Sequence, residues 1–121
     1  MKGRILVAAA TLGVTLLAST SFAAVAHSPT VVTVSMYDMG FKLSKPVVRP
    51  GTLIFRTVND GMVEHDFRFK KVGPSGLGTP MLGPGERATI KLHTHKAGRY
   101  PFVCTVPGHA AAGMKGTLIV K

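Results

Sequence analysis

The strongest chemical signal is a short segment that carries a thiol, an imidazole and a thioether. Cys104, His109 and Met114 follow one another in the order Cys-x4-His-x4-Met. Pro107-Gly108 lies between the first two, so the backbone can turn and bring the side chains together. Thiolate and thioether favour Cu(I), whereas imidazole also suits Cu(II). We therefore expect these three residues to bind one metal ion.

A second imidazole would complete the ligand set, and His65 is positioned to provide it. It follows the turn signal Asn59-Asp60-Gly61 and begins a segment in which His65, Phe67 and Phe69 alternate with polar residues. Two histidines, one cysteine and a weakly bound methionine are the ligands of blue-copper sites. The sequence thus predicts one copper ion held by His65, Cys104, His109 and Met114.

Cys104 is the only cysteine of the chain. Exported proteins usually pair their cysteines in disulfides. A lone thiol in an oxidising compartment survives best when it is buried or bound to metal. A buried, inert cysteine is the alternative to the metal ligand, but the histidines and methionine nearby favour the metal.

The first residues have the layout of a secretory signal. Lys2 and Arg4 precede an uncharged run, which continues into a stretch of small residues. We expect a signal peptide at residues 1–26, cleaved after Ala23 or Ala26, and one domain at residues 27–121. An uncleaved anchor is the alternative, because residues 5–26 carry no charge and could span a bilayer. Either way the domain is expected outside the cytoplasm, in the periplasm or at the extracytoplasmic face.

The charge balance restricts the partners. Fifteen Lys and Arg against five Asp and Glu give a net charge of +10, and residues 1–26 contribute only two of the basic side chains. A basic surface suits redox partners with acidic surfaces, and it also permits peripheral contact with an anionic membrane. No long basic run is present, which argues against nucleic acid. We expect a monomer.

Short strands dominate the pattern after the leader. Extended segments are predicted at 30–35, 47–48, 52–58, 65–70, 87–95, 99–104 and 116–121, with a loop at 73–85. About seven or eight strands at this spacing indicate an all-β sandwich or barrel. The segment from His109 to Met114 is too short for more than one helical turn.

From about Val32 to its end, the chain resembles the cupredoxins of the plastocyanin, azurin and auracyanin kind. The resemblance lies in the turn before His65, in Ala97-Gly98-Arg99-Tyr100 before Cys104, and in Cys-x4-His-x4-Met. Plastocyanin has a shorter Cys-to-His loop and azurin a shorter His-to-Met loop, so the spacing is most similar to auracyanin-like proteins. The resemblance implies a Greek-key β-sandwich with copper at one end, held by the four residues above.

Asp66 stands where many cupredoxins have asparagine. The resemblance implies that its side chain ties together the two loops that carry the ligands. Three further histidines could bind a second metal. His93 and His95 share one face of a predicted strand, and His27 would begin the mature chain after cleavage at Ala26. Exposed surface residues are the simpler interpretation of all three.

Single-electron transfer is the function that this site suggests. No open coordination position backed by a general base is evident, so we do not expect an enzyme. Redox partners would dock near His109, whose neighbours are small and uncharged. The alternative is a periplasmic copper carrier or copper-resistance protein on the same fold. A cysteine or zinc hydrolase is disfavoured, because Met114 would have no role in it.

Overall fold

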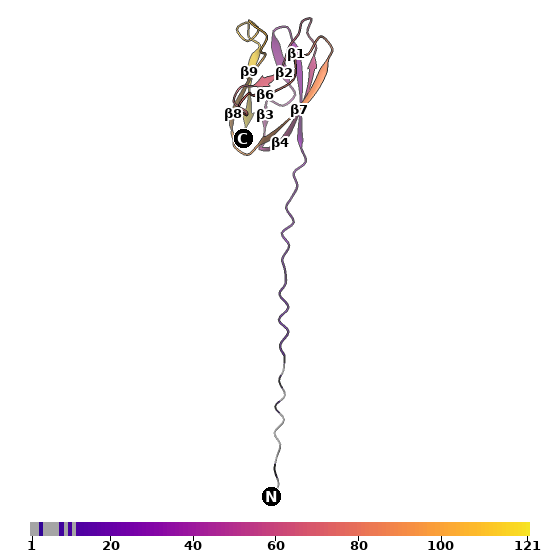
Figure 1. The fold of residues 1–121 in the computed structure, drawn as a ribbon, viewed down its shortest axis with the longest axis vertical. Coiled ribbons are helices and arrows are strands. Elements are labelled where there is room, and N and C mark those ends of the chain that lie inside the picture. The colour runs from indigo at the N-terminus through magenta and orange to yellow at the C-terminus, as the bar shows by residue number, and fades with distance from the viewer. Residues whose placement is uncertain (1–2, 4–7, 9, 11) are drawn as a thin grey trace.

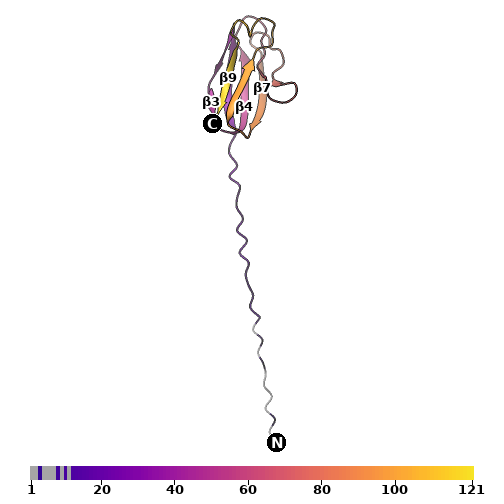
Figure 2. The same cartoon turned by 90° about the vertical axis from the view of Figure 1, so that its left-hand side faces the viewer.

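The protein folds into a two-layered β-sandwich, and its N-terminal segment extends away from one end (Figures 1 and 2). The computed structural model describes residues 3, 8, 10 and 12–121. Lys2, Arg4 and Ile5, the charged start and first apolar residue of the expected leader, lie outside the described residues. Residues 12–29 have no regular secondary structure. Within the described part of the chain, no helix has the length and apolar character needed to cross a membrane.

In the described part of the chain, nine strands form the two layers. One sheet has the order β2-β1-β4-β7 and the other the order β3-β9-β8-β5-β6. The strand bounds are β1 Thr30–Tyr37, β2 Gly40–Leu43, β3 Val47–Val48, β4 Gly51–Asn59, β5 Arg68–Phe69, β6 Leu77–Gly78, β7 Arg87–Thr94, β8 Gly98–Val103 and β9 Lys115–Val120. The all-β sandwich predicted from the sequence is therefore confirmed.

The strand prediction agrees in outline and is wrong in one detail. About seven or eight strands were expected and nine form among the described residues, because β2 pairs with β1 in a tight hairpin and β6 lies inside the predicted loop 73–85. The predicted strand 65–70 shrinks to β5. Its first residue, His65, makes only an isolated bridge to Leu82.

The core explains why the strand pattern succeeds elsewhere. Alternate residues of β1 and β4 are buried between the sheets, including Val32, Val34, Leu53 and Phe55. An aromatic cluster fills the space toward the second sheet, with ring centroids 4.9 to 6.0 Å apart. Its members are Phe41, Phe55, Phe67, Phe69 and Phe102. Each fully buried phenylalanine stabilises the fold by about 1.5–3 kcal/mol.

The sandwich has two ends of different construction. We call one the site end; it comprises the turn between β1 and β2, the segment 60–66, and the segment 104–114 between β8 and β9. At the far end, Gly51 pairs with Thr94 and Gly98 pairs with Val120. The N-terminal segment leaves from the far end, where the C-terminus also lies (Figure 1). All four predicted metal ligands belong to the site end.

Candidate metal centre

Three of the four predicted ligands converge at the site end. Nδ1 of His65 lies 3.2 Å from Nδ1 of His109. The Sγ atom of Cys104 lies 3.6 Å from Nδ1 of His109 and 3.9 Å from Nδ1 of His65. Within the described part of the chain, this is the one group of three or more His, Cys, Asp or Glu side chains that could hold a metal ion.

The backbone between β8 and β9 fixes the second half of the site. Cys104 follows the last residue of β8, and its amide donates to the carbonyl of Met114 at 3.1 Å. The amide of Met114 in turn donates to the carbonyl of His109 at 3.0 Å. Gly108 has a φ of 83°, a left-handed conformation that suits glycine before the histidine. Overlapping hydrogen-bonded turns and no regular helix form the segment 106–114, which agrees with the prediction that at most one helical turn fits there.

Met114 is completely buried. Its backbone hydrogen bonds to both Cys104 and His109 hold it beside these two ligands. A buried thioether at this position could act as a weak axial donor. The role of Met114 as the fourth ligand stays a prediction from the sequence.

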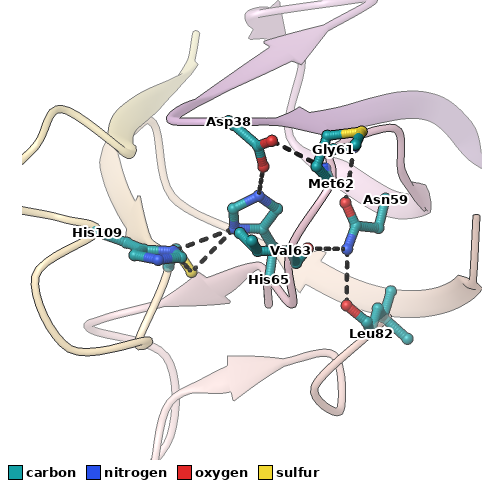
Figure 3. A network of polar contacts seen from close by, with 9 residues as sticks. Asp38, Asn59, Gly61, Met62, Val63, His65, Leu82 and His109 are labelled. Carbon is teal, nitrogen blue, oxygen red and sulfur yellow. Dashed lines mark hydrogen bonds and ion pairs between the residues drawn. The ribbon is translucent and has the colours of Figure 1, made fainter. Parts of the chain in front are cut away.

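His65 is held from its outer side by a carboxylate that the sequence did not point to. Its Nε2 donates to Oδ1 of Asp38, which lies in the turn after β1, at 2.7 Å (Figure 3). The other oxygen of Asp38 accepts the amide of Met62 at 2.9 Å. Because Nε2 carries the proton, Nδ1 presents its lone pair to Cys104 and His109.

Gly61 makes room for this contact. A Cβ atom at position 61 would lie 2.9 Å from Nε2 of His65 and would clash with the carboxylate of Asp38. The preceding Asn59 stabilises the loop, because its side chain donates to the carbonyls of Val63 and Leu82 at 2.8 and 2.7 Å. Asn59 and Gly61, which form the predicted turn before His65, therefore help to position the imidazole.

The charge of Asp38 is stabilised at this place. Hydrogen bonds from the amide of Met62 and from the His65 ring lower the pKa of the carboxyl below its ordinary value. Asp38 is consequently ionised at neutral pH. A negative charge in contact with one ligand makes the site more favourable for a cation.

Asp66 joins the two ligand segments, as the resemblance implied. Its carboxylate accepts the amide of Thr105 at 2.6 Å and the hydroxyl of the same residue at 2.7 Å. The guanidinium of Arg68 lies 3.6 Å away. Asp66 is buried where it makes these bonds.

Burial keeps the Cys104 thiol protonated when no metal is bound. Desolvation raises the pKa of this thiol above its ordinary value, and the nearby charge of Asp66 raises it further. A thiolate at this position therefore requires a compensating cation. Nδ1 of His65 and Nδ1 of His109 face the sulfur, so the donor set fits a bound metal ion.

Exposure differs among the predicted ligands. His65, Cys104 and Met114 are buried, whereas His109 is half-buried. The residues around His109 are small or apolar and include no charged side chain from 106 to 114. One imidazole edge is thus the point at which the centre approaches the surface.

The remaining histidines lie apart from this centre. His93 is exposed and contacts the hydroxyl of Thr52 at 3.1 Å. His95 is exposed two residues further along, and His27 lies in the strand-free tail next to the carbonyl of Val25. Among the described residues none of the three joins a metal-binding group.

Comparison with known proteins places the chain in a family. Residues 7–120 match the cupredoxin-like domain, and the chain belongs to that family. A stretch of 42 residues is 50% identical to auracyanin-B of Chloroflexus aurantiacus and covers 35% of this chain and 18% of that protein. The copper-resistant cuproprotein CopI of Rubrivivax gelatinosus is 29% identical over 114 residues, which cover 79% of this chain and 69% of that protein.

Solved structures support the same fold. Auracyanin B superposes with a TM-score of 0.67 at 26% identity, covering 80% of this chain and 93% of that chain. Reduced rusticyanin gives a TM-score of 0.60 at 23% identity, covering 79% of this chain and 81% of that chain, and shows the fold alone. The family and the donor set agree on the cofactor, which is copper.

Proposed function

We propose that the protein is a type 1 copper protein that carries single electrons. His65, Cys104, His109 and Met114 hold the ion, and Asp38 and Asp66 orient their loops. The observation that carries this proposal is the difference in exposure: three ligand side chains are buried and one imidazole edge reaches the surface. Such a site can pass electrons through the exposed edge of His109.

The chain's own residues make electron transfer fast by limiting rearrangement. Bound copper supplies a one-electron Cu(I)/Cu(II) couple. The hydrogen bonds of Asp38, Asp66 and the Met114 backbone keep the ligand atoms in place in both oxidation states. The buried position of Cys104 excludes water from the thiolate.

Redox partners dock at the surface around His109. Its neighbours Pro107, Gly108 and Ala110–Ala112 carry no charge, so a partner can approach closely without desolvating ions. Exposed Met62 and Val63 extend the apolar surface at the site end. The net positive charge of the chain favours acidic partners at long range, and exposed Lys115 next to Met114 supplies a cation beside the docking surface, while the contact itself is apolar.

Export is part of the proposal. The charged, apolar and small-residue segments of positions 1–26 favour a secretory signal, with cleavage after Ala23 or Ala26. An unpaired cysteine then persists outside the cytoplasm because copper binds it. The protein acts in the periplasm or at the extracytoplasmic face, and an uncleaved leader would anchor it there.

Visible absorption of the copper-loaded, oxidised protein tests the function. We expect a strong blue or green band from the bond between thiolate and copper, together with reversible one-electron reduction. Cys104→Ser should abolish the band, whereas His95→Gln, an exposed change outside the centre, should leave it unchanged. A coloured Cys104→Ser protein would overturn the assignment.

A periplasmic copper carrier is the second candidate, favoured by the similarity to the copper-resistant cuproprotein CopI. Carriers release their metal to a recipient, which suits exposed ligands better than buried ones. The discriminating measurement is retention. A carrier would surrender copper to a modest chelator within minutes, whereas the buried centre of an electron carrier should hold its copper through repeated redox cycles.

A further inference from the structure

The acidic residues of the protein gather toward one end, whereas exposed cations such as Arg87, Lys115 and Lys121 are spread over both ends. All five acidic residues lie between positions 38 and 86, in segments of the site end or next to it. Asp38 contacts His65, and Asp66 contacts Thr105. Asp60 and Glu64 lie in the segment between β4 and His65, and Glu86 accepts the amide of Gly83 next to Leu82, the bridge partner of His65.

The far end is basic and has no acidic side chain. Strand register brings its parts together: Val48 pairs with Val120, and the amide of Lys121 donates to the carbonyl of Val48 at 2.9 Å. Thr94 and Gly98 flank the connection between the sheets at the same end. Four exposed cations therefore gather there, which we call the far-end cations: Arg49, Lys96, Arg99 and Lys121.

These cations have no internal electrostatic role. Within the described residues, none of the four side chains takes part in a salt bridge or a hydrogen bond. Lys96 contributes only its backbone carbonyl, which accepts the hydroxyl of Tyr100 at 2.9 Å. Their charges are available to an external anionic surface.

The N-terminal segment emerges at the same end. The first residue of β1, Thr30, pairs with Leu53 near the beginning of β4. Both views show the tail leaving the sandwich from the end opposite the site end (Figures 1 and 2). Residues 5–26 of that tail carry no charge. An apolar segment in a bilayer would therefore bring the far-end cations next to the lipid headgroups.

We infer that the far end of the sandwich docks on an anionic lipid surface and holds the site end away from it. Basic residues next to a membrane are attracted by anionic headgroups, about fivefold in affinity for each cation. The carboxylates lie toward the other end and are repelled, so their one-sided distribution also orients the molecule. Docking uses surfaces distinct from that around His109, and it would leave the imidazole edge accessible to a redox partner.

Vesicle binding of the full, copper-loaded chain tests this inference. We compare sedimentation with vesicles of mixed phosphatidylglycerol and phosphatidylcholine against pure phosphatidylcholine vesicles. An inserted tail binds both kinds, so the ratio of the two affinities reports the cations alone. We expect a preference for anionic vesicles that falls at high salt. The readout does not depend on copper, so it can fail while the electron-transfer proposal stands.

Two variants with equal loss of charge localise the effect. Changing the four far-end cations to glutamine should reduce the preference for anionic vesicles at least tenfold. The matched control changes four exposed cations of the remaining surface to glutamine: Arg56, Lys70, Lys71 and Arg87. It should stay within about twofold of the unchanged protein.

Three outcomes would overturn the inference. Equal losses in the two variants would mean that only net charge matters. A far-end variant with unchanged preference would remove these cations from the binding surface. An unchanged protein without preference for anionic vesicles would leave an acidic protein as the partner of this end.

Discussion

The carboxylate of Asp38 holds the imidazole of His65 at 2.7 Å, although 27 residues separate the two in sequence. The contact depends on the parallel pairing of β1 with β4, which aligns Met36 with Asn59 and brings the turn after β1 beside the loop after β4. Figure 3 shows the carboxylate between the His65 ring and the Met62 amide. The ring is thus fixed on the side opposite to Nδ1.

Asp38→Asn should raise the reduction potential of the copper centre. The carboxylate charge stabilises Cu(II) more than Cu(I), and the neutral amide lacks that charge. A tenfold change in the one-electron equilibrium corresponds to about 60 mV, and we expect a shift of this order. Redox titration followed by visible absorption measures it. Asp60→Asn is the control, since that carboxylate bonds Ser35 and not a ligand; an equal shift in both variants would contradict the direct role of Asp38.

Gly61→Ala should disturb the same contact from the other side. The added methyl would press on both Asp38 and Nε2 of His65. We expect a loss of about 1–3 kcal/mol in the free energy of unfolding and a rise in potential in the direction of Asp38→Asn. Gly83→Ala is the control, because its Cβ would meet only the Glu86 carboxyl at an ordinary 3.6 Å. If the two changes act through one contact, Gly61→Ala should add little to Asp38→Asn, and fully additive potential shifts would refute this.

The sequence could predict those parts of the metal centre whose residues lie close together in the chain. The spacing of Cys104, His109 and Met114 predicts one loop, and the structure builds that loop from overlapping hydrogen-bonded turns. Asp38 could not be found in this way. An aspartate in a turn after a strand is common, and its contact with His65 arises only from the pairing of distant strands. A contact between distant segments also explains why the predicted strand 65–70 is wrong. The backbone of His65 forms hydrogen bonds with Leu82 alone and does not join a continuous strand ladder.

Asp66→Ala should loosen the connection between the two ligand segments. It leaves the amide and hydroxyl of Thr105 without their charged acceptor. Hydrogen bonds to charged groups contribute about 1.5–3 kcal/mol each, so we expect the metal-free protein to lose at least ~2 kcal/mol in the free energy of unfolding. Urea denaturation measures the loss. Asp66→Asn retains one acceptor for the amide of Thr105 and should recover part of the lost stability. Equal destabilisation by both changes would show that the hydrogen bonds to Thr105 require the charge of the carboxylate.

Metal-free protein should lose stability at alkaline pH because of Cys104. Burial raises the thiol pKa in the folded state, so the native state keeps a proton that the unfolded chain releases above about pH 8.5. The contribution is fully present below that pH and declines as pH rises toward the folded pKa. The free energy of unfolding, measured from pH 7 to pH 10, should therefore fall more steeply than in Cys104→Ala. Parallel curves for the two proteins would show that the thiol does not cause the decline.

Met114→Leu should keep copper bound but raise its reduction potential. The thioether is the weakest of the four proposed donors, and the other three still form a trigonal set. Loss of an axial donor removes electron density that stabilises Cu(II) more than Cu(I). Leucine has nearly the same volume, so the buried site should remain packed at a cost below about 1.5 kcal/mol. Met81→Leu, an exposed change outside the loop, should leave the potential unchanged. A lower potential in Met114→Leu would exclude Met114 as an axial donor, and loss of copper would mean that its sulfur is needed to hold the ion.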